Sequence, residues 1–335
     1  MRYPRGPVRK PTGYAGAVRG KLTAGAAVLL VAAACASPEP AVPTAEELSW
    51  RALAEAPTPR TEVAAALADG RIYAVGGFAA PNRTVDTVEV YDIAADAWSP
   101  GPPLPLAVNH AMAATVDGRI HVLGGFTARG PPTDQAFVLR DGSWTELPPM
   151  PEPRAAGGAA VIDSTLYVVG GVGPDGVALR TMVFDPAAGR WTFAAGLGRP
   201  REHMGVAAAG GLVYAVGGRA GSLEGFGDLE VYEPGGDGWR PLPDMPTPRG
   251  GMAAAATSNG LVVAVGGEEE GGTFEEAEAF HIEVGRWLTL PPLPTPRHGL
   301  GVVADGTTVY AIAGGPDPGL AFTGAVEAID LAPLG

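Results

Sequence analysis

The chain has 335 residues and is 46% apolar, and its 50 glycines and 34 prolines together make up about a quarter of it. This much Gly and Pro disfavours helical bundles and coiled coils, whereas the apolar fraction argues against a disordered chain. The composition therefore favours an all-β protein with many tight turns.

The charge is unevenly distributed along the chain. The first 21 residues carry six basic side chains and no acidic one. The remainder has 17 basic and 36 acidic residues, a net charge of −19. Because a body this acidic repels phosphate backbones, we expect no nucleic-acid partner.

Residues 1–34 have the pattern of a secretory signal peptide. The basic segment is followed by an apolar run over Ala24–Ala34, which is too short to span a bilayer core of about 30 Å comfortably. We therefore predict a signal peptide and export across the cytoplasmic membrane. An uncleaved transmembrane anchor is the alternative.

Cys35 is the only cysteine, so an intrachain disulfide and a multi-cysteine metal site are excluded. The five residues that end at Cys35, VAAAC, resemble the bacterial lipobox, although Ala32 stands where leucine is usual. The resemblance implies lipidation of Cys35 and a lipid anchor in the bacterial cell envelope. Residues 35–48 would then be the anchor site and a Pro-rich linker. Ordinary signal-peptidase cleavage, with Cys35 as a bystander, is the alternative.

Residues 49–335 contain six copies of one unit. A Gly-Gly pair follows an apolar run in each, beginning at Gly76, Gly124, Gly170, Gly217, Gly266 and Gly314. All six tryptophans keep the same period, at Trp50, Trp98, Trp144, Trp191, Trp239 and Trp287. Two independent markers with one spacing predict a repeat architecture.

Each unit has the pattern of four strands. In the first unit we expect strands over Glu62–Ala68, Arg71–Val75 and Thr87–Asp92, and a fourth strand that Trp98 opens. Asp69-Gly70 is a strong hairpin signal between the first two strands. The small residues of the first strand suit a crowded position near an axis.

These units resemble the kelch repeat. The marks are the apolar run into Gly-Gly, the Glu-x-Tyr-Asp of Glu89, Tyr91 and Asp92, the Trp six residues later, and the Arg that opens the next unit. The resemblance covers residues 49–335 and implies a β-propeller with one four-stranded blade per unit. We therefore predict an all-β, six-bladed β-propeller with four antiparallel strands per blade.

The two ends of the repeat region predict how the ring closes. The sixth unit has a third strand at Glu327–Asp330 but no Trp strand after it, whereas Trp50 has no Gly pair before it. We expect Ser49–Leu53 to supply the missing outer strand of the blade built by residues 298–331. This N-terminal strand carrying Trp50 would pair an edge that otherwise stays open.

The residues that open the units recur for a structural reason, in our interpretation. Five units open on an arginine, at Arg60, Arg154, Arg201, Arg249 and Arg297, and the second has Val108 instead. A residue that recurs once per blade belongs to the scaffold. We expect an ion pair or a loop brace.

Candidate functional residues follow these opening positions. An antiparallel meander puts the loops between blades and between the second and third strands on one face. The two residues after each opening position include six polar ones, which we expect to be exposed near the mouth of the central channel: Glu62, Asn109, His110, Glu202, His203 and His298. Three histidines on alternate blades could bind a metal or transfer protons. A packing role competes with this interpretation, and no short metal motif occurs, so the sequence predicts no metal and no cofactor.

Four arginines in the long loops do not recur in register and are candidate ligand-binding residues: Arg83, Arg129, Arg180 and Arg219. Long loops on a rigid scaffold are where binding usually occurs. The acidic run Glu268-Glu269-Glu270 we interpret as solvated.

Three functions are compatible with a kelch-like propeller. A binding module needs only a loop face that holds a protein or a glycan. A carbohydrate-active enzyme similar to the sialate mutarotases, which are kelch-like propellers, would use Glu62, Glu202 and His203 for proton transfer. A copper oxidase similar to galactose oxidase needs a cysteine crosslinked to a tyrosine in the folded domain, and Cys35 lies outside it. The sequence excludes the third function and favours the first, as a lipid-anchored monomer outside the cytoplasm.

Overall fold

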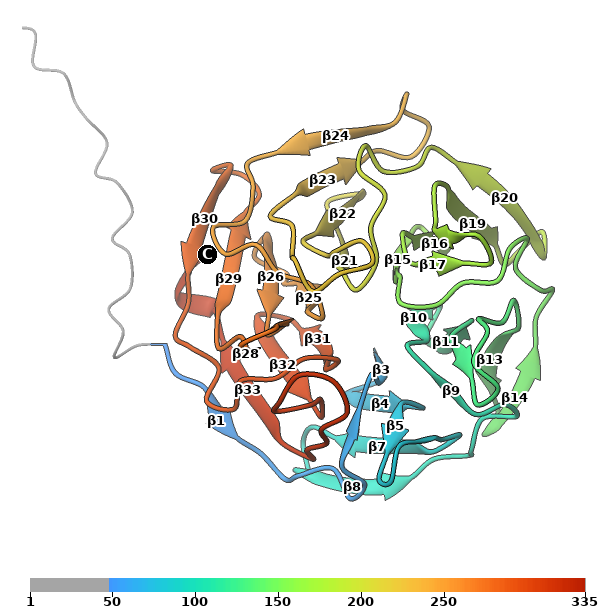
Figure 1. Cartoon of the computed structure of the whole chain (residues 1–335), viewed down its shortest axis with the longest axis horizontal. Helices are drawn as coiled ribbons and strands as arrows, with labels where there is room; N and C mark the ends of the chain where they lie inside the picture. The colour runs from blue at the N-terminus through green and yellow to red at the C-terminus, as the bar shows by residue number, and fades with distance from the viewer. Residues whose placement is uncertain (1–47, 335) are drawn as a thin grey trace, which may run out of the picture. The chain divides into compact units, whose positions relative to one another are not determined.

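The computed structural model describes residues 48–334, so the predicted signal peptide and Cys35 lie outside the described residues. Within these residues, six four-stranded antiparallel sheets surround a central axis (Figure 1). Each sheet is one blade of a β-propeller. The predicted fold class is therefore confirmed.

The four strands of each blade follow one another from the axis outward. The innermost strands are β3 (Ala64–Ala68), β10 (Met112–Val116), β15 (Gly158–Ile162), β21 (Gly205–Ala209), β25 (Ala253–Ala256) and β31 (Gly301–Asp305). The second strands are β4 (Arg71–Val75), β11 (Arg119–Leu123), β16 (Thr165–Val169), β22 (Leu212–Val216), β26 (Leu261–Val265) and β32 (Thr308–Ile312). The third strands are β7 (Val88–Asp92), β13 (Ala136–Arg140), β19 (Thr181–Asp185), β23 (Leu229–Tyr232), β29 (Ala277–His281) and β33 (Val326–Asp330). The outer strands are β8 (Ala97–Pro100), β14 (Ser143–Glu146), β20 (Arg190–Ala194), β24 (Trp239–Leu242), β30 (Arg286–Thr289) and β1 (Arg51–Ala52).

The remaining elements are short. Two-residue strands lie in the connections, as β2 (Arg60–Thr61), β5 (Phe78–Ala79), β6 (Arg83–Thr84), β9 (Val108–Asn109), β12 (Phe126–Thr127), β17 (Val172–Gly173), β18 (Gly176–Val177), β27 (Glu268–Glu269) and β28 (Gly272–Thr273). One 3₁₀ turn, η1 (Ala332–Leu334), ends the described chain. Among residues 48–334, no helix has the length and apolar character to cross a membrane.

The ring closes as predicted. Strand β1 pairs antiparallel with β33, Arg51 opposite Ala328 and Ala52 opposite Glu327. Each innermost strand contacts the innermost strands of both neighbouring blades, and β31 returns to β3. The apolar core is accordingly divided into six clusters, one between each pair of neighbouring blades.

The tryptophans join neighbouring blades. Each indole Nε1 donates a hydrogen bond to a backbone carbonyl of the preceding blade, and Trp98 to Ala54 O (2.8 Å) is an example. Trp50 does the same across the closure, to Pro291 O at 2.9 Å. The recurring tryptophan therefore has the structural role that its period predicts.

The opening arginines are scaffold residues, as the sequence predicts. All five are fully buried, and four of them pair with a glutamate on the third strand of their own blade. Arg60 is typical: Nη2 lies 2.8 Å from Glu89 Oε2, and the guanidinium also donates to the carbonyls of Ala74 on the second strand and of Gly76 directly after it. The second blade lacks both partners, because Val108 replaces the arginine and Phe137 occupies the position of the glutamate.

Two details of the repeat differ from the prediction. The innermost strand begins at Ala64 and not at Glu62, because Glu62 adopts a left-handed conformation (φ 54°) that interrupts the strand. In the sixth unit, Ala313 (φ 55°) takes the backbone position of the first glycine of the pair, so Gly314 and Gly315 stand one residue later than in the other units.

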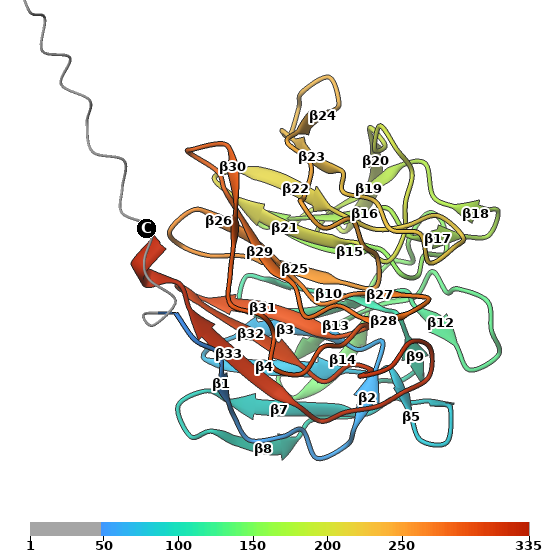
Figure 2. The same ribbon diagram turned by 60° about the vertical axis from the view of Figure 1, so that its left-hand side comes forward.

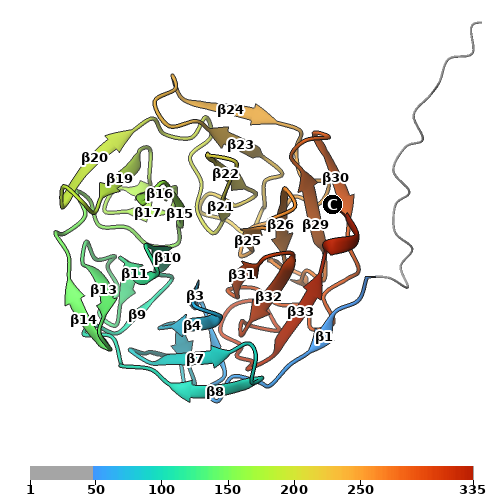
Figure 3. The same ribbon diagram turned by 180° about the vertical axis from the view of Figure 1, so that it is seen from behind.

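The two faces of the propeller differ. The short strands β5, β12, β17 and β18 lie on one side, which we call the loop face, and η1 lies on the other (Figure 2). The opposite face is seen in Figure 3 and carries the tight turns within blades, such as Asp69-Gly70 with both residues at positive φ. Bridges join the blade-to-blade connections to the loops between second and third strands, Ala155 to Val172 among them. The predicted placement of both kinds of loop on one face is confirmed.

Candidate functional site

Six residues form a ring around the loop-face mouth of the channel, one from each blade. We call it the mouth ring: Glu62, His110, Ala156, His203, Gly251 and Gly299. All six have a left-handed backbone, with φ between 51° and 73°. The amide of each residue from His110 to Gly299 donates to the carbonyl of the preceding member at 2.8–3.0 Å, and Val63 N closes the circle on Gly299 O at 3.2 Å. The backbone thus fixes where each side chain starts.

Three of the six positions carry almost no side chain. Ala156 separates His110 from His203, so the two imidazoles meet edge to face with ring centroids 4.8 Å apart. A Cβ on Gly299 would lie 2.6 Å from Glu62 Oε1, and one on Gly251 would lie 3.1 Å from Glu268 Cγ. The small residues therefore leave room for the polar side chains to converge above a channel cavity of about 160 Å³.

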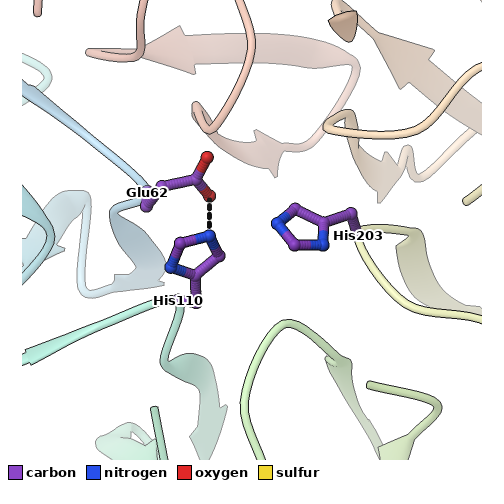
Figure 4. Close-up of side chains that lie close together, drawn as sticks. All are labelled: Glu62, His110 and His203. Carbon is purple, nitrogen blue, oxygen red and sulfur yellow. Dashed lines mark ion pairs between the residues drawn. The ribbon is translucent and has the colours of Figure 1, made fainter. Parts of the chain in front are cut away.

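Glu62 is the centre of this convergence. Its Oε2 lies 3.1 Å from His110 Nε2, and its Oε1 lies 3.2 Å from His298 Nδ1. Figure 4 shows Glu62, His110 and His203 pointing toward one another. One carboxylate therefore joins side chains from three different blades.

A second layer of charged residues lies behind the ring. Arg219 is placed between two carboxylates, with Nε 3.5 Å from Glu202 Oε1 and Nη1 2.8 Å from Glu268 Oε1. Glu202 also contacts His203 Nδ1, and Glu268 Oε1 lies 3.6 Å from His298 Nδ1. We call the polar mouth-ring residues and this second layer the mouth cluster, which comprises Glu62, His110, Glu202, His203, Arg219, Glu268 and His298.

Burial and mutual charge set the protonation states in the mouth cluster. Burial raises the pKa of Glu62, but the surrounding imidazoles lower it by more, so the net pKa lies well below that of a free glutamate. Burial lowers the pKa of both His110 and His203, which favours neutral imidazoles. Burial also lowers the pKa of His298, but Glu62 and Glu268 raise it by more. The cluster thus combines an ionised carboxylate, two neutral imidazoles and a histidine that favours its charged form.

The structure brings most of the candidate residues together. Glu62, His110, Glu202, His203, His298 and Arg219 all belong to the mouth cluster, and Asn109 supports it. Asn109 Oδ1 lies 2.6 Å from His110 Nδ1, and Asn109 Nδ2 donates to Thr84 Oγ1 at 2.8 Å. The residues are less exposed than expected: Glu202 is only 5% exposed, because it packs beneath Arg219.

The other three arginines lie apart from the mouth cluster. Arg180 pairs with Glu152 and stacks over the ring of Phe193 at 3.6 Å. Arg83 and Arg129 are exposed in their loops. Only Arg219 among the four loop arginines reaches the channel mouth.

The interpretation of Glu268 as part of a solvated acidic run is wrong. It is 4% exposed and lies at the centre of the second layer, since Glu268 N donates to Gly250 O at 2.9 Å and draws the residue onto the loop between blades. Arg219 holds the same position in its blade, paired with Glu202. Both residues directly follow a Gly-Gly pair, so comparing that position across units would have identified Glu268.

Aromatic side chains flank the mouth cluster on one side. Phe78 and Phe126 follow the first two Gly-Gly pairs, and both rings meet the His110 ring edge-on, with centroids 6.0 and 5.5 Å away. Both are partly exposed. The site therefore offers hydrogen-bonding groups beside an apolar rim, a combination typical of ligand pockets.

The fold and the site define a β-propeller whose loop-face mouth holds a buried cluster of carboxylates, imidazoles and one guanidinium. A family model, the KLHDC2/KLHL20/DRC7 Kelch-repeats domain, matches residues 109–315, and the Kelch motif matches residues 59–105. The first match covers more than half of the chain, so the chain belongs to the kelch-repeat family. Kelch propellers generally mediate protein interactions.

Solved structures share the fold. One described as "Structure of YjhT" is 17% identical, covers 82% of this chain and 95% of its own, and superposes with a TM-score of 0.71. At this identity the likeness shows the fold alone. No curated protein matches the chain by sequence.

Proposed function

We propose that this propeller is a binding module that holds a protein or a glycan ligand on its loop face, centred on the mouth cluster. The convergence of three carboxylates, three imidazoles and one guanidinium at a single channel mouth carries the proposal. Buried charged groups are expensive to maintain unless they are paired, and a scaffold role alone does not require them at this mouth. The loops of the same face differ from blade to blade, which provides the asymmetry that recognition needs.

The chemistry of the site suits a polar group with an apolar side. Carboxylates accept hydrogen bonds and Arg219 donates them, while Phe78 and Phe126 can stack on an apolar surface. The cavity of about 160 Å³ beneath the ring admits a small group only. A sugar ring or a single side chain, presented by a larger glycan or protein, fits these features.

The ligand test compares two partly exposed phenylalanines, one at the mouth and one away from it. In a panel of immobilised glycans and free sugars, we expect a binder whose affinity falls at least tenfold, about 1.4 kcal/mol, in Phe126→Ala. The control is Phe193→Ala, because Phe193 is 39% exposed on β20 and contacts Arg180 instead. An equal loss of affinity in both variants would contradict binding at the mouth cluster. A glycan or sugar that contacts the turn Asp117-Gly118 would contradict it as well.

A carbohydrate-active enzyme of the sialate-mutarotase kind is the second candidate. The observation in its favour is the pair of neutral imidazoles, His110 and His203, beside the ionised Glu62. Such groups can exchange protons with a sugar hydroxyl. The same sugar panel separates the two candidates, because an enzyme accelerates exchange between the anomers observed by NMR, whereas a binding module only shifts or broadens their signals.

We further propose that the propeller acts outside the cytoplasm, anchored by a lipid on Cys35. The support is the basic and apolar pattern of residues 1–34 followed by VAAAC. In a bacterial host, the wild-type chain should incorporate a labelled fatty acid and partition with membranes. Cys35→Ser should incorporate none and remain soluble or uncleaved. A wild-type chain that is exported without the label would leave simple secretion in place of lipidation.

A further inference from the structure

Three potential metal-ligating atoms meet at the mouth ring. The ligand atoms of Glu62, His110 and His203 all lie within 4.8 Å of one another, and the side chains point to a common centre (Figure 4). They come from the first, second and fourth blades, and their backbones are linked through the hydrogen-bonded circle of the mouth ring. Such fixed starting points are what a preorganised site requires.

The outer nitrogens of the two imidazoles face oxygen atoms. His110 Nδ1 lies 2.6 Å from Asn109 Oδ1, and His203 Nδ1 contacts the carboxylate of Glu202. A neutral imidazole has one proton, and a proton given to these acceptors leaves the lone pair on Nε2. Both lone pairs are then directed toward the common centre. This is how metal-binding histidines are usually held, with the second nitrogen donating to an oxygen.

The same assignment leaves two acceptors face to face. With its proton on Nδ1, His110 presents a lone pair to Glu62 Oε2 at 3.1 Å. A cation between the two atoms would turn this repulsion into attraction. The wider cluster also has an excess of negative charge, because its three carboxylates, Glu62, Glu202 and Glu268, face only two cationic groups, the guanidinium of Arg219 and the imidazole of His298.

We propose that Glu62, His110 and His203 bind a divalent transition-metal ion such as Zn²⁺, with a remaining coordination position open to the ligand. Two imidazoles and one carboxylate are a frequent donor set for sites that keep an open position. Bonds of about 2.0–2.1 Å in a tetrahedron place ligand atoms roughly 3.3–3.5 Å apart, close to the distance between Glu62 Oε2 and His110 Nε2. Ala156, Gly251 and Gly299 leave the rest of the ring without side chains that would fill the open position.

His298 is a positioning residue in this arrangement. Its Nδ1 faces Glu62 Oε1 at 3.2 Å, and its Nε2 lies 3.2 Å from the carbonyl oxygen of Asp317. Because both nitrogens face acceptors, His298 holds the carboxylate of Glu62 and offers no lone pair to an ion. The second group of nearby ligand atoms, Glu62, Glu268 and His298, is therefore the less suitable site.

The site uses the same cluster as the proposed function, but its test requires no ligand. Isothermal titration of the untagged full chain with Zn²⁺ should give one ion per chain. His110→Asn, His203→Asn and Glu62→Gln should each weaken binding at least tenfold. Asparagine tolerates the left-handed backbone that both histidines adopt (φ 52° and 51°), so these variants should fold. Circular dichroism of each variant checks this.

The matched control is His281→Gln, since His281 lies on β29 away from the mouth cluster and should leave Zn²⁺ affinity unchanged. The absorption spectrum of bound Co²⁺ gives a second measure: a site with nitrogen and oxygen ligands and few waters absorbs far more strongly than the hydrated ion. The proposal is overturned if the wild-type chain shows no 1:1 binding, or if the folded His110→Asn and His203→Asn variants bind as tightly as His281→Gln. A glycan that binds to a chain that shows no 1:1 Zn²⁺ binding would overturn the metal site while supporting the proposed function.

Discussion

Replacing Trp50 by alanine should lower the free energy of unfolding by about 3 kcal/mol, the lower end of the range for truncating a packed tryptophan. The indole is partly buried against the apolar cluster between the fifth and sixth blades. It also donates to Pro291 O at 2.9 Å. Strand β1 has only two paired residues, so the backbone ladder alone holds the closure weakly. Urea denaturation of the full chain measures the change. Unfolding is monitored by the circular dichroism of the backbone, because this signal does not depend on the tryptophan that the variant lacks.

The control for this experiment is Glu55→Ala, a few residues along the same segment. Glu55 is exposed, and substitutions at such positions usually change stability by less than about 0.5 kcal/mol. If Trp50→Ala were no less stable than Glu55→Ala, the side chain of Trp50 would have no part in closing the ring. The closure would then depend on the backbone bonds between residues 51–60 and the sixth blade and on the contact of β31 with β3.

The fold could be predicted from the sequence because each blade repeats the same physical requirements. An indole is needed wherever an outer strand meets the preceding blade, and Gly76 is needed because a Cβ there would lie 2.4 Å from Val108 O of the next blade. The indole recurs in all six blades and the glycine in five, with Ala313 in its place in the sixth, so these requirements appear as a period. The start of the innermost strand could not be predicted in this way, since the left-handed conformation of Glu62 comes from the mouth ring, which exists only after the ring has closed.

The candidate site was only partly predictable for a related reason. Comparing units at the positions after the opening arginine identifies Glu62, His110 and His203 as occupants of equivalent places. Their mutual distances depend on the radius of the ring and on the small size of Ala156 between the histidines, neither of which any local motif contains. Arg219 and Glu268 approach because each pairs with the neighbouring connection in its own blade. That pairing is a property of the loops, and its only trace in the sequence is the position directly after the Gly-Gly pair.

Buried charged side chains are paired differently in the mouth cluster and in the blade scaffold. In the scaffold, four of the five arginines meet a glutamate of their own blade, and their guanidinium groups also donate to backbone carbonyls, so each of these charges is paired within one blade. In the mouth cluster, one guanidinium is shared by two carboxylates and the third carboxylate faces imidazoles. We therefore expect substitutions in the scaffold pairs to change the free energy of unfolding, and substitutions in the mouth cluster to change ligand binding.

Removing one partner of a scaffold pair should be strongly destabilising. Arg60→Val leaves Glu89 buried without its cation, and breaking a buried pair in this way costs about 3–5 kcal/mol. It also removes the hydrogen bonds that the guanidinium donates to the carbonyls of Ala74 and Gly76. We expect the corresponding loss in urea denaturation of the full chain.

The second blade supplies the compensating change for this experiment. Val108 and Phe137 stand there in place of the arginine and the glutamate, so an apolar pair satisfies the same part of a blade. The double variant Arg60→Val with Glu89→Phe removes the unpaired carboxylate and should recover at least half of the stability lost in Arg60→Val, because replacing both partners by apolar groups is often nearly neutral. A double variant no more stable than the single one would mean that the arginine acts through its bonds to Ala74 and Gly76 and not through Glu89. A loss below about 1 kcal/mol in Arg60→Val would mean that the buried pair does not hold the blade together.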